Sequence, residues 1–301
     1  MAAPARRGRW LWKLFAWPGI IWLALLFVFP LYVVLALAFG SLDPIFRSPV
    51  PVWNPLNWDP TQFQYVLTHI FGEDGFFGPA IVRTVVFVII ASVGCLLISY
   101  PVAYFVSRFG GRRKALLLGL LIAPFWISYM MRMLAWVNLL QIDGWVNKAL
   151  SVGGLFPVHV AWLDGRPTTV VLGLIYGYVP YMILPLYAGL DRIQQSLLEA
   201  ARDLGASRWS TFRRVTLPMS KPAVLASLLL VTLPMVGDYF TNDLLSGSPS
   251  TAMFGNLINS AIAVPAEVGQ GAAFLVLMFV VLLAPMVYYI RATERQEGET
   301  V

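Results

Sequence analysis

The feature that most restricts this sequence is a series of long apolar blocks, with most charged residues confined to the short segments between them. A helix of about 20 apolar residues crosses the bilayer core, which is about 30 Å thick, and these blocks are long enough to do so. Of the 301 residues, 58% are hydrophobic and only 12% are charged, against about 25% charged in a soluble protein. The sequence therefore excludes a soluble fold and predicts an all-α membrane protein.

We expect six transmembrane helices in one membrane domain, residues 14–291, between two cytoplasmic end segments, 1–13 and 292–301. The expected spans are residues 14–39, 79–106, 115–140, 168–190, 223–246 and 271–291. Two other segments, 144–163 and 255–271, are too polar or too short to span. We expect both outside the membrane, the first with an interfacial helix and the second dipping towards the headgroups.

Lysine and arginine are distributed unevenly among the connections. Of the 21 basic residues, 16 lie in residues 1–13, in the tail from Arg291 onwards and in the connections after the second and fourth spans. The other connections hold three: Arg47, Lys148 and Arg166. Because basic residues are retained on the cytoplasmic side, both termini are predicted to be cytoplasmic. The basic residues behind the net charge of +6 lie in short segments between apolar blocks and do not form a basic face on a soluble surface. We therefore expect no nucleic-acid partner.

The sequence contains no pattern for catalysis or for metal binding. His69 and His159 have no histidine or cysteine at ligand spacing, and the single cysteine, Cys95, lies inside an apolar block. An intramembrane enzyme would need paired acids, a Ser/His set or a metal motif at one depth, and none is visible. We therefore expect no enzymatic activity and no cofactor bound by this chain.

The connection between the fourth and fifth spans, residues 191–222, has the pattern of two short helices joined by a glycine. Ser196 and Glu199 have the spacing of a capping box at the first helix start. Gly205 suits the left-handed position that ends a helix. The second helix is rich in arginine and is expected to stop at Pro218. These residues alone predict either an ordinary amphipathic connector or a rigid elbow displayed to a cytoplasmic partner.

This connection resembles the EAA loop of ABC-importer permeases. The shared pattern is Glu199-Ala200-Ala201, three residues, Gly205, nine residues and then Val215-Thr216-Leu217-Pro218, with Val215 in place of isoleucine. The resemblance implies a coupling helix that docks into a cytoplasmic ATPase. It assigns the coupling positions to Glu199, Ala200, Ala201, Asp203, Leu204, Gly205, Leu217 and Pro218.

Three further runs, 124–136, 177–187 and 237–245, resemble the spermidine/putrescine (polyamine) permeases. Asn242 stands where that subfamily usually has proline, and Ser246 interrupts a usual glycine pair. The resemblance implies that the chain forms half of a translocation pathway for a polyamine. The alternative substrates are another amine, an opine or an amino-acid-like solute.

The resemblance also implies the partners and the location. These are a cytoplasmic ATPase dimer that binds ATP and Mg, a second, homologous permease subunit, an extracytoplasmic substrate-binding protein and the lipid of the bacterial inner membrane. A secondary transporter or a channel is the other alternative, but neither would need the coupling loop.

Arg132 and Asp238 are charged residues that lie far from the inner ends of expected spans. Along straight helices they would lie about 25 and 22 Å from the inner ends. A charge in the bilayer costs at least a few kcal/mol, so each needs a partner or a function. Either they form a structural ion pair, or Asp238 attracts a cationic substrate that aromatic faces also hold. The expected substrate pathway consists of Asp238, Tyr239, Asp243, Trp126, Tyr129, Tyr178 and Tyr181.

The charge asymmetry predicts that Ser207 and Ser248 lie on opposite sides of the membrane. We would place single cysteines at these positions in a Cys95→Ala background and treat intact spheroplasts with a membrane-impermeant thiol reagent. The cysteine at 248 should react at once, and the cysteine at 207 only after permeabilisation. Labelling of both in intact spheroplasts would contradict the orientation.

Overall fold

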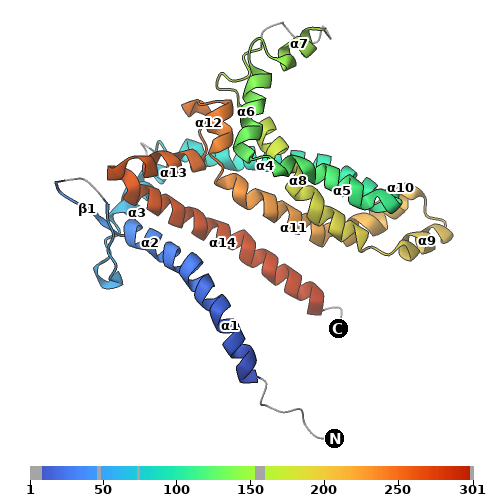
Figure 1. Cartoon of the computed structure of the whole chain (residues 1–301), viewed down its shortest axis with the longest axis horizontal. Coiled ribbons are helices and arrows are strands. Elements are labelled where there is room, and N and C mark those ends of the chain that lie inside the picture. The colour runs from blue at the N-terminus through green and yellow to red at the C-terminus, as the bar shows by residue number, and fades with distance from the viewer. Residues whose placement is uncertain (1–8, 46–48, 73–74, 153–159, 299–301) are drawn as a thin grey trace, which may run out of the picture. The chain divides into compact units, whose positions relative to one another are not determined.

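The computed structural model describes residues 9–45, 49–72, 75–152 and 160–298, and its regular structure is almost entirely helical (Figure 1). In this part of the chain, five helices are long and apolar enough to cross a membrane, and one bent pair of helices makes a sixth if it is counted as a single span. The all-α membrane fold is therefore confirmed. The chain divides into two compact units, and each is described by itself.

The first unit contains the described residues up to Gly75 together with Ile258–Val280. Its elements are α1 (Arg9–Leu23), a π-helical turn (Ala24–Val28), α2 (Phe29–Ala38), β1 (Ser41–Leu42), β2 (Pro49–Val50), a 3-10 turn (Pro55–Asn57), α3 (Thr61–Phe71), the end of α13 (Phe254–Ala263), a 3-10 turn (Pro265–Glu267) and the start of α14 (Val268–Gly298). The helix of the first span begins at Arg9 and that of the last continues to Gly298, so the end segments are partly helical.

A small polar and aromatic cap follows the first span. The two strands pair antiparallel, with Ser41 opposite Val50. Phe39 stacks on Trp58 with ring centroids 4.5 Å apart. At the start of α3, the hydroxyl and the N–H of Thr61 donate to the Asp59 carboxylate, which lowers the pKa of Asp59. These contacts fix the chain where it leaves the apolar helix.

The second unit contains the described residues of Phe76–Leu257 and of the chain from Val281 onwards. Its further elements are α4 (Gly78–Phe109), a 3-10 turn (Gly111–Arg113), α5 (Lys114–Ile122), a 3-10 turn (Ala123–Trp126), α6 (Tyr129–Leu140), α7 (Trp145–Val152), α8 (Pro167–Asp191), α9 (Gln195–Asp203), α10 (Arg208–Thr211), a π-helical turn (Phe212–Thr216), α11 (Leu217–Val236), α12 (Phe240–Leu245) and a 3-10 turn (Pro249–Thr251). Helices α4, α8 and α11 pack together and form its core (Figure 1).

Small residues and hydroxyl groups join these three helices. Ser99 of α4 donates to the carbonyl of Val179 on α8 at 3.1 Å. Ser92 of α4 lies 3.2 Å from the hydroxyl of Thr232 on α11. Because lipid offers no hydrophobic drive for helix association, such hydrogen bonds and close van der Waals contacts hold membrane helices together.

The third expected span, residues 115–140, is not one straight helix. The segment Gly111–Trp126 meets α6 at an angle of 84°. Ile127 and Ser128 adopt extended backbone between them, which ends the helical hydrogen-bond pattern. Because α6 turns away at the bend, the depth of Arg132 depends on where the segment Gly111–Trp126 ends and not on a residue count continued along one straight helix.

The fifth expected span, residues 223–246, is also interrupted. Its helix ends at Val236, and α12 begins at Phe240. In the opposite direction, the helix continues unbroken back to Arg208. Pro218 therefore does not end it, contrary to the prediction, because a π-helical turn directly precedes this proline and changes the hydrogen-bond register there.

The close approach of α8 to α11 predicts the effect of one added methyl group. A Cβ on Gly189 would lie 2.1 Å from the Cβ of Ala223. Gly189→Ala should separate the helices and destabilise the protein by about 1–3 kcal/mol, as overpacking does. The measurement is the midpoint of thermal unfolding of purified protein in detergent. Gly119→Ala, where a Cβ meets nothing within 4 Å, is the matched control; equal midpoints would contradict this packing.

Candidate functional site

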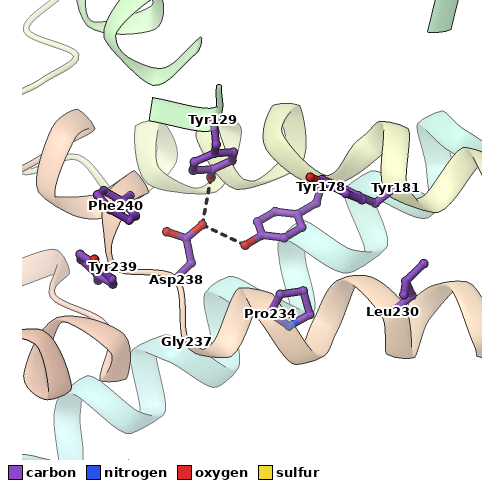
Figure 2. A pocket seen from close by; sticks show the side chains of 9 residues that line it. All are labelled: Tyr129, Tyr178, Tyr181, Leu230, Pro234, Gly237, Asp238, Tyr239 and Phe240. Atoms are coloured by element: carbon purple, nitrogen blue, oxygen red, sulfur yellow. Dashed lines mark hydrogen bonds between the residues drawn. The ribbon is translucent and has the colours of Figure 1, made fainter. Parts of the chain in front are cut away.

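A pocket of about 510 Å³ opens beside the break between α11 and α12 (Figure 2). Asp238 lies in the break, between Gly237 and Tyr239. The pocket is lined by Tyr129, Tyr178, Tyr181, Leu230, Pro234, Gly237, Asp238, Tyr239 and Phe240. It therefore combines one carboxylate with several aromatic side chains and otherwise apolar walls.

Neutral donors from three elements surround the Asp238 carboxylate, which is 7% exposed. The hydroxyls of Tyr129 and Tyr178 donate to it at 2.9 and 3.1 Å (Figure 2). Thr241 adds its hydroxyl at 2.9 Å and its N–H at 3.0 Å. These hydrogen bonds satisfy the carboxylate oxygens, and none of the donors is a cation.

The break places Asp238 directly before the start of α12. The Asp238 carboxylate accepts the N–H of Thr241 in the first turn of this helix, as a capping side chain does. Sequence reasoning missed Thr241. The signal was present, since an aspartate follows Gly237 and stands three residues before Thr241.

Two glycines on α8 make room for the residues around Asp238. A Cβ on Gly177 would lie 2.7 Å from the ring of Tyr129. A Cβ on Gly173 would lie 2.7 Å from the side chain of Thr241. This small-xxx-small pair therefore seats α6 and α12 closely against α8.

The start of α13 supports the break from another direction. The amide of Asn256 donates to the carbonyl of Tyr239 at 3.2 Å and to the carboxylate of Asp243 at 2.6 Å. A Cβ on Gly255 would lie 2.6 Å from the carbonyl oxygen of Gly237. The polar backbone that the break exposes is thus partly paired, as buried irregular backbone requires.

The structure brings together five of the seven residues expected along the substrate pathway. Asp238, Tyr239, Tyr129, Tyr178 and Tyr181 all line the pocket. The other two do not line it: Trp126 is 86% exposed in the turn after α5, and Asp243 is exposed and bonded to Asn256.

Of the two alternatives for Arg132 and Asp238, the ion pair is absent: the structure describes both residues and has no ion pair between them. The guanidinium of Arg132 instead lies 4.9 Å from the ring centre of Phe125 and 5.4 Å from that of Tyr129. The bend before α6 redirects this helix, so the residue spacing along a straight span did not predict which side chains meet.

The connection between α8 and α11 forms a second candidate site. Its first helix, α9, begins at Gln195, and Gln194 before it makes no side-chain capping bond. The predicted capping box at Ser196 is therefore wrong, because the helix starts two residues earlier than a Ser196 cap requires. The predicted left-handed conformation of Gly205 is confirmed: its φ is +86°. The N–H of Gly205 bonds to the carbonyl of Arg202, and that of Ala206 to Ala201, which is a Schellman motif.

Most of the predicted coupling positions are exposed in this connection. Leu204 is 89% exposed, whereas Leu198 on the opposite face of α9 is 3% exposed and packs in the core. Ala201 is half-buried; the exposed positions are Glu199, Ala200, Asp203, Leu204, Gly205, Leu217 and Pro218. The elbow is thus anchored on one side and open on the other.

Side chains from the end of α4 and the start of α5 hold the base of this elbow. The guanidinium of Arg108 donates to the carbonyls of Leu190 and Ile193 at 3.0 and 3.1 Å. Lys114 forms an ion pair with Asp191, with 2.5 Å between Nζ and the carboxylate oxygen. The connection therefore leaves α8 from a fixed point.

The model of one protein family, the binding-protein-dependent transport system inner membrane component, matches residues 96–295. The matched part includes both the pocket and the elbow. The chain belongs to this family. It is therefore a multi-pass inner-membrane component of a binding-protein-dependent transport system, and not itself a catalytic subunit.

Known relatives in the family extend the likeness. The spermidine/putrescine transport system permease protein PotB of Escherichia coli strain K12 is 34% identical over 207 residues, which are 68% of this chain and 74% of the relative. The protein of the same name from Haemophilus influenzae is 31% identical over 275 residues, 91% of each chain.

Among solved structures, a bacterial alginate ABC transporter in complex with an alginate pentasaccharide-bound periplasmic protein contains a similar chain. The TM-score is 0.73, with 22% identity and 96% of each chain covered. This likeness supports the family fold.

Proposed function

We propose that the chain is a permease subunit of an ATP-driven importer and forms half of the translocation pathway for a polyamine such as spermidine or putrescine. The observation that carries this proposal is the Asp238 carboxylate, which lines an aromatic pocket and has only neutral hydrogen-bond donors. The relatives named for spermidine/putrescine transport support the same substrate class.

The chemistry of the pocket suits an organic ammonium group. Asp238 supplies a negative charge that no protein cation cancels among the described residues. Tyr181 and Phe240 are both exposed and line the pocket beside it. Each ring face holds a cation by about 0.5–2 kcal/mol. Several such contacts bind a cation and still release it, which a transport pathway requires.

The connection between α8 and α11 serves, in this proposal, as the coupling helix for a cytoplasmic ATPase dimer. An exposed edge ending at Leu204 offers an apolar contact, and Gly205 fixes the turn that displays it. The other partners are a second, homologous permease subunit and the binding protein that delivers the substrate. Both termini lie in the cytoplasm, as the basic residues indicate.

Loss of the Asp238 charge should reduce transport. In Asp238→Asn the pocket keeps its shape but no longer attracts an ammonium group, so uptake of radiolabelled spermidine and putrescine should fall about tenfold or more, the effect of losing one charge-assisted contact. Complex abundance, measured by co-purification, should stay near the wild-type level. Asp243→Asn, which removes an exposed charge outside the pocket, is the matched control.

Normal polyamine uptake by a well-assembled Asp238→Asn complex would contradict the role of this carboxylate. If the wild-type complex instead imports an opine or an amino-acid-like amine and no polyamine, the permease role would remain and the substrate would change.

The coupling role predicts a different defect. Gly205→Pro cannot adopt the observed positive φ, because proline is fixed near −65°. Each of the two single changes, Gly205→Pro and Glu199→Lys, should leave the chain inserted in the membrane but abolish ATPase co-purification and uptake. Gly205→Asn is the matched control, since asparagine tolerates a positive φ. Wild-type uptake in both Gly205→Pro and Glu199→Lys would rule out this coupling site.

A further inference from the structure

Arg132 is a buried cation without a hydrogen-bond partner for its side chain among the described residues. It is 5% exposed, and its Nε is buried and unpaired. Its guanidinium contacts two aromatic rings, those of Phe125 and Tyr129. Ring contacts leave most of the N–H donors of an arginine unused. In a membrane protein a buried cation is costly, so it is usually paired with an anion.

A second pocket, of about 450 Å³, lies against Arg132 and has almost entirely apolar walls from α4, α5, α6 and α8. Along α8 it extends from Leu172 to Ile183, which is about 16 Å at 1.5 Å per residue. Leu120 on α5 and Ile98 on α4 border it and are exposed. The groove thus has the length and the character of a site for one acyl chain.

The polar end of this groove lies near one membrane boundary. From Gly111, the segment that leads to Trp126 rises about 24 Å, and α6 then turns through 84°. A bilayer core of about 30 Å leaves Arg132 within several ångströms of the far boundary. An arginine side chain covers such a distance by snorkelling.

We propose that an anionic phospholipid binds in this groove. Its phosphate accepts hydrogen bonds from Arg132, and one acyl chain lies along α8 between Leu172 and Ile183. The lipid belongs to the leaflet opposite the coupling connection. It holds α6 against α8 at the bend. It also neutralises Arg132, the one cation that lines the groove among the described residues.

This site is distinct from the pocket around Asp238. Tyr178 and Tyr181 of α8 line the Asp238 pocket, whereas Tyr176, Val179 and Ile183 line the groove on another face of the same helix. The positive charge of Arg132 is thereby kept out of the cation pocket. A lipid here supports the structure without competing with a transported solute.

The test is native mass spectrometry of the purified, assembled complex, delipidated and then incubated with phosphatidylglycerol or with phosphatidylcholine of the same acyl chains. The wild-type complex should retain phosphatidylglycerol in preference to phosphatidylcholine. Arg132→Gln should lower its retention about tenfold, because the charge-assisted hydrogen bonds to phosphate are lost. Arg132→Lys should restore part of it, and Arg112→Gln, which removes an exposed arginine, should match wild type.

A second variant tests the groove without touching the arginine. Leu172→Trp fills the exposed end of the groove and should also lower phosphatidylglycerol retention, even if Arg132→Gln fails to assemble. Excess inorganic phosphate should not displace the lipid, because the acyl chain contributes to binding. Wild-type retention by Leu172→Trp or by an assembled Arg132→Gln complex, equal retention of the two lipids by wild type, or displacement by phosphate would each overturn the proposal.

Discussion

The second unit depends on accommodating one buried carboxylate inside an apolar helix bundle. Asp238 meets this constraint with neutral donors: two phenols, one hydroxyl and one backbone N–H. Those donors come from α6, α8 and α12, so three elements must converge on one point. Glycines on α8 allow the convergence, since a Cβ on Gly177 would collide with the ring of Tyr129. The packing around the pocket thus follows from satisfying a single charge.

Interruptions of regular helix are what bring polar groups to these positions. The break after Val236 exposes Asp238 to the pocket, and the bend before Tyr129 directs one phenol to Asp238. Each interruption leaves backbone groups that lipid could not satisfy. Side chains such as Asn256 pair them instead. At the break after Val236, irregular backbone therefore occurs where other parts of the protein pair with it.

The pocket and the elbow are joined by the same two helices. The helix containing α11 starts beside the elbow and ends at Gly237, next to Asp238. Helix α8 carries Tyr178 at its middle and ends at Asp191, where Lys114 and Arg108 hold it. Two continuous helices of the packed core thus join this connection to the pocket.

The sequence by itself determined the apolar spans, the uneven basic residues, the elbow with Gly205 and five of the residues that meet in the pocket. These properties are local, because span length, helix-ending glycines and motif spacing depend on neighbouring residues. Tertiary structure decided the bend before Tyr129, the continuation of the helix through Pro218 and the separation of Arg132 from Asp238. It also placed Thr241 beside Asp238. Which charged side chains meet depends on how bent helices pack in three dimensions, and counting residues along straight spans does not contain that information.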